Sequence, residues 1–154
     1  MESTSKKMAR WTLNKLVVFV LLGGFCILLV QVRFDHRSVI RENAIAWIPI
    51  IFSTVMIFIS LFGLLFWSRG GRRILQVFYF LAVLVGLVGF WYHTKGKPVR
   101  ALEHDLSVWT RKIPDEDKPP AFAPLAFAGF GILGVLVCAK RFQPPTPEPY
   151  APRV

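Results

Sequence analysis

Four long apolar runs, separated by shorter polar segments, dominate the hydrophobic pattern of this chain. They cover about residues 16–32, 44–67, 74–92 and 121–140, and none has a charged residue or a histidine in its interior. Charge-free runs of about 18 or more residues are typical of membrane-spanning helices. A bilayer offers backbone groups no water, so such runs form helices. We therefore expect an all-α membrane protein with four transmembrane helices.

Two of the runs begin with related sequences. Residues 46–52 read AWIPIIF, and residues 121–127 read AFAPLAF. Each run also follows an earlier apolar run that ends close to a histidine, His36 in the first case and His93 in the second. We interpret the chain as two related helical hairpins in which Pro49 and Pro124 are equivalent. Because each hairpin has two spans, the pattern predicts parallel repeats about an axis along the membrane normal.

The polar segments divide the chain further. Residues 1–15 form a basic tail that resembles the first part of a signal peptide, but the run after it is long and lacks a small-residue cleavage site, so we expect a retained helix. Residues 16–142 are the predicted four-helix transmembrane domain, and residues 143–154 form a Pro-rich tail. In the basic segment 68–73, Gly70 and Gly71 are expected to allow a tight reversal between the second and third spans.

The connector between the third and fourth spans predicts a short amphipathic helix on the membrane surface. Its apolar residues recur at helical spacing, and polar residues lie between them. These apolar residues are Val99, Leu102, Leu106 and Trp109.

Small residues recur on one face of the second span and of the fourth. Membrane helices associate where small side chains let their backbones approach, so we predict that these faces pack against other helices. The residues are Ser53, Ser60, Gly63, Ala128, Gly131, Gly134 and Cys138. The alternative is that glycine and alanine are simply frequent in membrane helices.

Composition and charge narrow the class of protein. Hydrophobic residues make up 54% of the chain, and the formal net charge is +10. The basic residues flank the apolar runs, which indicates anchoring to lipid headgroups, and no compact basic domain exists to bind nucleic acid. Basic residues lie closest to the helix ends on the side of the two termini, so we expect both termini in the cytoplasm of a plasma or inner membrane.

The chemistry of the spans argues against an enzyme. Pumps and intramembrane hydrolases need ionisable or nucleophilic groups within the bundle. The spans offer only the hydroxyl groups of Ser53, Thr54, Ser60 and Tyr79, and the sequence has no phosphate-binding, zinc-protease or serine-hydrolase motif. Cys26 and Cys138 form no Cys-x-x-Cys or Cys/His cluster. We therefore predict a non-enzymatic protein without a resident cofactor.

One group of potential metal ligands lies in the connectors opposite the termini. Imidazole and carboxylate together suit a divalent metal such as zinc. The candidates are His36, Glu42, His93, Glu103 and His104. We hypothesise that the three histidines approach one another, with Glu42 or Glu103 as a fourth ligand. The alternative is that all of them are ordinary polar residues of the membrane interface.

Three functions remain open from the sequence. The first is an accessory or scaffold subunit that contacts the lipid bilayer and either a membrane-protein partner or a second copy of the chain. The second is a bundle that binds a metal, haem or lipid-like ligand at its extracytoplasmic face. The third is a small-solute transporter or channel, which the lack of charge within the spans disfavours.

Overall fold

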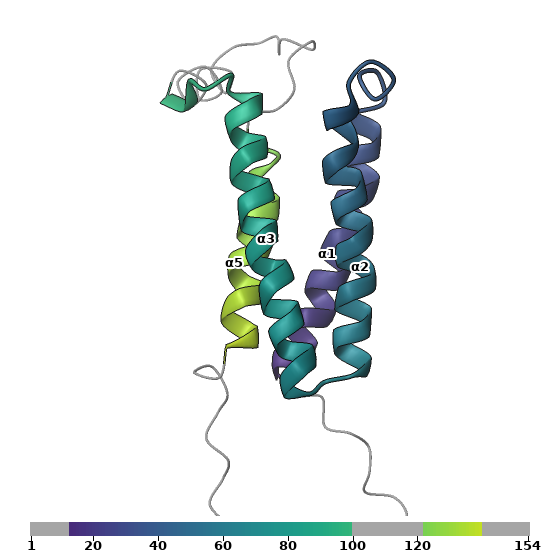
Figure 1. Cartoon of the computed structure of the whole chain (residues 1–154), viewed down its shortest axis with the longest axis vertical. Helices are drawn as coiled ribbons and strands as arrows, with labels where there is room; N and C mark the ends of the chain where they lie inside the picture. The colour runs from purple at the N-terminus through teal and green to yellow at the C-terminus, as the bar shows by residue number, and fades with distance from the viewer. Residues whose placement is uncertain (1–12, 100–121, 140–154) are drawn as a thin grey trace, which may run out of the picture.

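The computed structural model describes residues 13–99 and 122–139, and these residues are helical apart from short turns (Figure 1). In chain order the elements are α1 (Leu13–Asp35), the short 3₁₀ helix η2 (Ala44–Trp47), α2 (Ile48–Leu65), α3 (Arg69–His93) and α5 (Leu125–Cys138).

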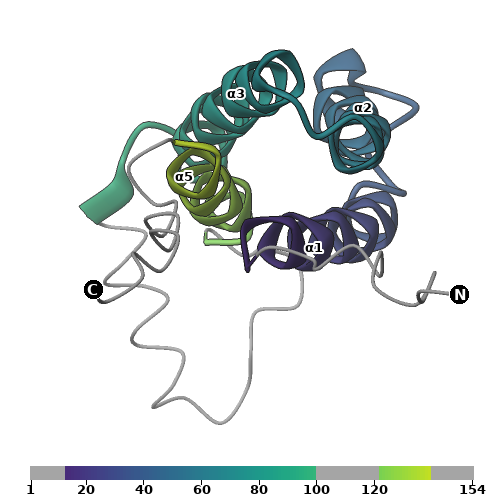
Figure 2. The same cartoon turned by 90° about the horizontal axis from the view of Figure 1, so that it is seen from below.

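Two antiparallel hairpins build the molecule. The first consists of α1 and α2, and the second consists of α3 and α5. Viewed along the helices, the four form a ring in which each packs against two neighbours (Figure 2). The start of α1, the α2–α3 turn and the end of α5 lie at one end of the ring (Figure 1). The Asn14 side chain joins α1 to α5 there, because its Nδ2 donates to the carbonyl of Val137 at 3.1 Å.

Three helices are long and apolar enough to cross a bilayer. They are Leu13–Asp35, the continuous segment Ala44–Leu65, and Arg69–His93. The described part of the fourth run, α5, has 14 residues, which at 1.5 Å per residue is about 21 Å, against a hydrocarbon core of about 30 Å. A membrane protein is thus supported by three helices, and the fourth span stays a prediction.

The repeat also stays a prediction. Pro49 occupies the second position of α2, where a missing N–H costs little, and Pro124 is the residue directly before α5. Each proline therefore lies at the start of the second helix of its hairpin.

The reversal between α2 and α3 differs from the sequence expectation. Residues 69–73 belong to the first turns of α3, and neither Gly70 nor Gly71 has a positive φ. The reversal lies earlier, at Phe66–Ser68, because the Ser68 hydroxyl caps α3 by accepting from the N–H of Gly71 at 3.1 Å. A side chain at Gly71 would collide with the carbonyl of Phe66, so this glycine is needed for close approach.

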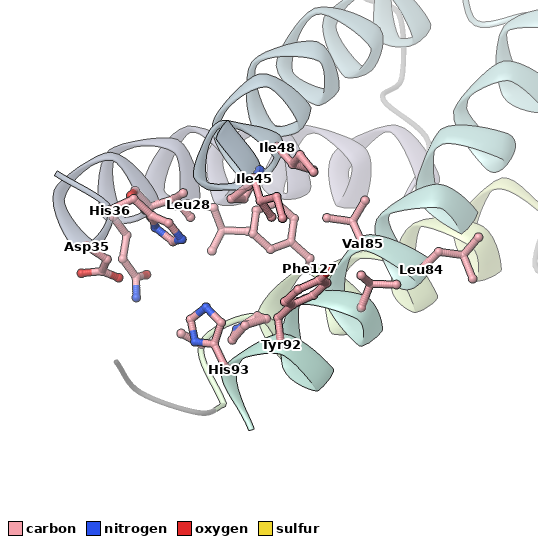
Figure 3. A pocket seen from close by; sticks show the side chains of 17 residues that line it. Leu28, Asp35, His36, Ile45, Ile48, Leu84, Val85, Tyr92, His93 and Phe127 are labelled. Atoms are coloured by element: carbon pink, nitrogen blue, oxygen red, sulfur yellow. Dashed lines mark hydrogen bonds between the residues drawn. The ribbon is translucent and has the colours of Figure 1, made fainter. Parts of the chain in front are cut away.

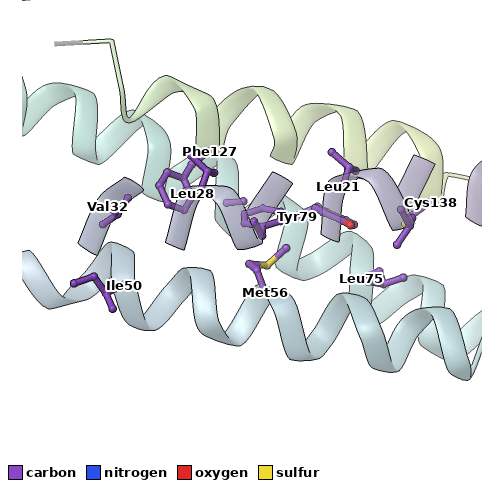
Figure 4. Close-up of a cluster of buried hydrophobic side chains, with 12 residues drawn as sticks. Leu21, Leu28, Val32, Ile50, Met56, Leu75, Tyr79, Phe127 and Cys138 are labelled. Atoms are coloured by element: carbon purple, nitrogen blue, oxygen red, sulfur yellow. The ribbon is translucent and has the colours of Figure 1, made fainter. Parts of the chain in front are cut away.

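The core runs along the axis of the ring, and Tyr79 of α3 lies near its centre (Figure 4). Its side chain is fully buried, and its ring centre is 6.3 Å from that of Phe25 on α1. The Tyr79 hydroxyl lies 3.4 Å from the hydroxyl of Ser60 on α2. One side chain therefore contacts two other helices, and its polar atom has a partner as the membrane interior requires.

The small residues named above are all buried. On α5, a Cβ atom at Gly131 would lie 2.6 Å from the carbonyl oxygen of Tyr79, and one at Gly134 would overlap the Tyr79 ring. On α3, a Cβ atom at Gly86 would lie 2.5 Å from the backbone nitrogen of Ala128. The α3 and α5 backbones therefore approach along a seam that admits no larger side chain.

Several predicted segments lie outside the described residues. They are residues 1–12 of the predicted basic N-terminal tail, the Pro-rich C-terminal tail and all but the beginning of the amphipathic helix, of which Pro98 and Val99 are helical. Residues 13–15, which were predicted to belong to the tail, instead form the start of α1.

Candidate functional site

A cavity of about 420 Å³ lies between the two hairpins, at the end of the molecule where α1 and α3 finish (Figure 3). Both hairpins contribute to its lining, and so does the segment that leads into α5. The volume falls in the range of small-molecule sites in proteins, about 300–1,000 Å³.

The walls of the cavity are apolar, and its polar side chains come from the ends of α1 and α3. Aliphatic and aromatic side chains face each other across it, including Leu28, Val32, Ile48, Val85 and Phe127. Its polar members are Gln31, Asp35, His36, Tyr92 and His93. An apolar chamber with a few polar groups at one end suits a ligand that has an apolar body and a polar head.

His36 lies on the first hairpin, one residue beyond α1. The backbone continues the helical pattern, because the His36 N–H donates to the carbonyl of Val32 at 3.0 Å. The ring nitrogen Nδ1 also lies 3.0 Å from that carbonyl. A carbonyl only accepts, so Nδ1 carries the proton in this contact and the Nε2 lone pair of a neutral ring points elsewhere.

His93 is the last residue of α3, and a dense set of hydrogen bonds holds that helix end. The Thr94 hydroxyl donates to the carbonyl of Phe90 at 2.9 Å. The N–H of Gly96, in the left-handed region at φ 70°, donates to the carbonyl of Trp91 at 3.0 Å. Lys95 is also left-handed, at φ 50°, and its N–H donates to the carbonyl of Tyr92 at 3.1 Å. The end of α3 is therefore a Schellman motif with Lys95 at the position where glycine is usual, and this motif fixes where His93 ends the helix.

The two imidazoles face each other across the cavity from different hairpins (Figure 3). Their ring centres are 6.2 Å apart, and their planes are inclined by 50°. Both side chains are half-buried. The separation exceeds that of a stacked pair and leaves room for one atom between the rings.

The other metal-ligand candidates do not complete this pair within the described residues. In residues 13–99 and 122–139, no group of three or more His, Cys, Asp or Glu side chains is arranged to hold a metal ion. Glu42 therefore does not join His36 and His93 in such a group. Glu103 and His104 lie outside the described residues.

Among the described residues at this end of the molecule, exposed cations outnumber carboxylates. The cations flank both histidines in the chain, and the carboxylates are those of Asp35 and Glu42. The cations are Arg33, Arg37, Arg41, Lys95 and Lys97. A ligand with an anionic head would meet a favourable electrostatic environment here.

The two prolines predicted to be equivalent both line the cavity. Pro124 packs close to α3, since a Cβ atom at Gly89 would lie 2.9 Å from the Pro124 Cβ. The sequence pattern singled out these two prolines but not Gln31 and Tyr92, which also line the cavity. No pattern in the spans indicates which side chains face it.

The hydroxyl groups of the spans are engaged in structural hydrogen bonds. Ser53 donates to the carbonyl of Pro49 at 2.7 Å, and Thr54 donates to that of Ile50 at 2.9 Å. Both bonds stay within α2, and such bonds to the preceding turn are usual for Ser and Thr in membrane helices.

Comparison of this chain with protein-family models, with curated proteins and with solved structures gives no match.

Proposed function

We propose that this protein is a non-enzymatic integral membrane protein that binds an amphiphilic, lipid-like molecule between its two hairpins. The observation that carries the proposal is the 420 Å³ cavity, which has apolar walls and two imidazoles among its polar residues. An apolar ligand body would replace lipid or detergent along the walls, and its polar head would reach the basic end of the molecule.

The absence of catalytic groups within the spans supports a binding role. No His, Asp, Glu, Lys or Arg lies in the interior of the apolar runs, and Ser53 and Thr54 already donate to backbone carbonyls. A serine nucleophile requires an adjacent base.

A photoreactive long-chain fatty acid in lipid nanodiscs tests the proposal. We expect crosslinks at cavity residues such as Leu28 and Val85, identified by mass spectrometry. Val85→Trp should fill the cavity and remove these crosslinks. Val77→Trp is the matched control, because Val77 lies on the same helix, is 58% exposed and does not line the cavity. Crosslinks that respond equally to both variants would contradict a cavity site.

A second candidate is the accessory or scaffold role. One observation favours it: Gly23 on α1 and Gly129 on α5 lie on the outside of the bundle, and a side chain at either would meet no atom within 4 Å. Small outward residues allow another membrane helix to approach. Under this role, Gly23→Leu and Gly129→Leu should each weaken co-purification of a partner chain or a second copy in mild detergent.

A further inference from the structure

The distance between the two imidazoles narrows the class of amphiphilic ligand that the cavity would bind. Two imidazoles that bind opposite sides of one metal ion, each through a bond of about 2.0–2.1 Å, have ring centres about 6 Å apart. The His36 and His93 ring centres are 6.2 Å apart. Two protein ligands do not make a zinc site, which takes three or four, but they satisfy a metal whose other positions are filled by a macrocycle.

We infer that the cavity binds haem, with His36 and His93 as the two axial ligands of its iron. This inference rests on the proposed amphiphile-binding function and names the ligand of that site. Haem is a planar amphiphile with an apolar ring and two propionate groups, so it meets the same requirements of shape and polarity.

The arrangement of the hairpins supports a planar ligand. His36 extends the first hairpin and His93 ends the second, and the cavity lies between the two hairpins. A ring plane perpendicular to the line between the imidazoles therefore coincides with the space between the hairpins. Aliphatic side chains from both, such as Leu28 and Val85, would contact the two faces of the ring.

The hydrogen bond of His36 also fits metal binding. Imidazoles that ligate metals usually donate their other ring nitrogen to a carbonyl or carboxylate, which fixes the orientation of the ring. The contact of His36 Nδ1 with the carbonyl of Val32 at 3.0 Å has this form and leaves Nε2 as the metal-binding atom.

The charges at this end match the polar edge of haem. Propionate groups are anionic, and Arg33, Arg37 and Lys95 are among the exposed cations that flank the two histidines. With the ring in the cavity, the propionates would extend toward these cations and the lipid headgroups.

Titration of the full-length protein in nanodiscs with ferric protoporphyrin IX tests the inference. We expect binding at a ratio of one and the absorption and electron paramagnetic resonance spectra of a low-spin iron with two imidazole ligands. His36→Ala and His93→Ala should each remove the low-spin signal and weaken binding more than about tenfold. His104→Ala is the matched control, because it removes the third histidine of the chain and should leave the spectrum unchanged.

Three further results distinguish an error in the assigned ligand, haem, from an error in the assigned site, the cavity. Added imidazole should restore the low-spin spectrum of His93→Ala, which shows that this variant is folded. A low-spin signal that survives in both alanine variants, or disappears in His104→Ala, would overturn the assignment. If ferric protoporphyrin IX fails to bind while the fatty-acid probe still labels Leu28 and Val85, the haem assignment is wrong and the lipid-binding proposal stands.

Discussion

Gly129 and Gly131 lie two residues apart on α5 and have opposite surroundings. A Cβ atom at Gly131 would lie 2.6 Å from the carbonyl oxygen of Tyr79 and 2.7 Å from the backbone nitrogen of Val83. At Gly129 it would meet nothing within 4 Å. Backbone atoms cannot rotate away as a side chain can, so Gly131→Ala has to separate α3 from α5.

We expect Gly131→Ala to destabilise the protein by about 1–3 kcal/mol, the usual cost of overpacking. The readout is unfolding by sodium dodecyl sulfate in mixed micelles, followed by circular dichroism. Gly129→Ala is the control and should be neutral or slightly stabilising, because alanine favours a helix by about 1 kcal/mol over glycine. Equal stability of the two variants would contradict the close α3–α5 seam.

Single residues also show which contacts could be predicted from the sequence and which could not. The periodicity of small residues identified the α5 face that contains Gly131 and Gly134. It could not identify Tyr79 as the side chain that fills the space opposite them. A tyrosine in an apolar run gives no signal for its partners, because its contacts with Ser60 and Phe25 depend on the rotation of three separate helices about their axes.

At the scale of elements, one polar contact joins α1 and α5 in the described part of the chain. The Nδ2 of Asn14 donates to the carbonyl of Val137 at 3.1 Å, and Asn14 is buried. The bond satisfies a carbonyl in the last turn of α5, where the helix itself provides no donor. It therefore closes the ring of helices between the first helix and the last.

Asn14→Ala should destabilise the protein by about 1 kcal/mol, within the range measured for hydrogen bonds between membrane helices. Thr54→Ala removes a hydroxyl whose bond stays within α2, so it should leave helix association nearly unchanged. Both are measured by the same detergent titration. If the two substitutions lower the stability of the protein equally, the hydrogen bond between α1 and α5 does not contribute specifically to helix association.

Element boundaries illustrate which parts of the fold the sequence could predict. The apolar runs located α1, α2 and α3, because a bilayer permits no other backbone structure in such runs. The predicted turn over residues 68–73 was wrong, because Ser68 caps α3 and the helix already begins at Arg69. The arginines and glycines of this segment gave no sign of that cap. Charge marks where a helix leaves the hydrocarbon, but the capping hydrogen bonds determine where the helix begins.

At the scale of the whole molecule, the candidate site depends on how the two hairpins sit relative to each other. The sequence placed His36 and His93 at the same end, because the runs before them alternate in direction. It could not predict an open cavity there, since the cavity depends on how the side chains of both hairpins are placed at this end, which no periodicity in the chain encodes.

The alternating helix directions also predict the topology in the membrane. Arg37 and Lys97 belong to the cavity end of the molecule, whereas Arg69 lies at the opposite end, at the α2–α3 turn. All three are exposed, so cysteines at these positions can react with a membrane-impermeant maleimide. The background is a chain in which Cys26 and Cys138 are replaced by alanine. In oriented vesicles, we expect cysteines at positions 37 and 97 to react from one side and a cysteine at 69 from the other.

The orientation follows from the basic residues near the helix ends. Arg69, Arg72 and Arg73 form a dense group in the first turns of α3, and such groups are retained in the cytoplasm during insertion. A cysteine at 69 should therefore be labelled from the cytoplasmic side, which places the candidate haem site at the extracytoplasmic face. Labelling of positions 37 and 97 from opposite sides would refute the hairpin arrangement. Labelling of position 69 from the extracytoplasmic side, with positions 37 and 97 labelled from the cytoplasmic side, would refute only the orientation. The candidate site would then face the cytoplasm.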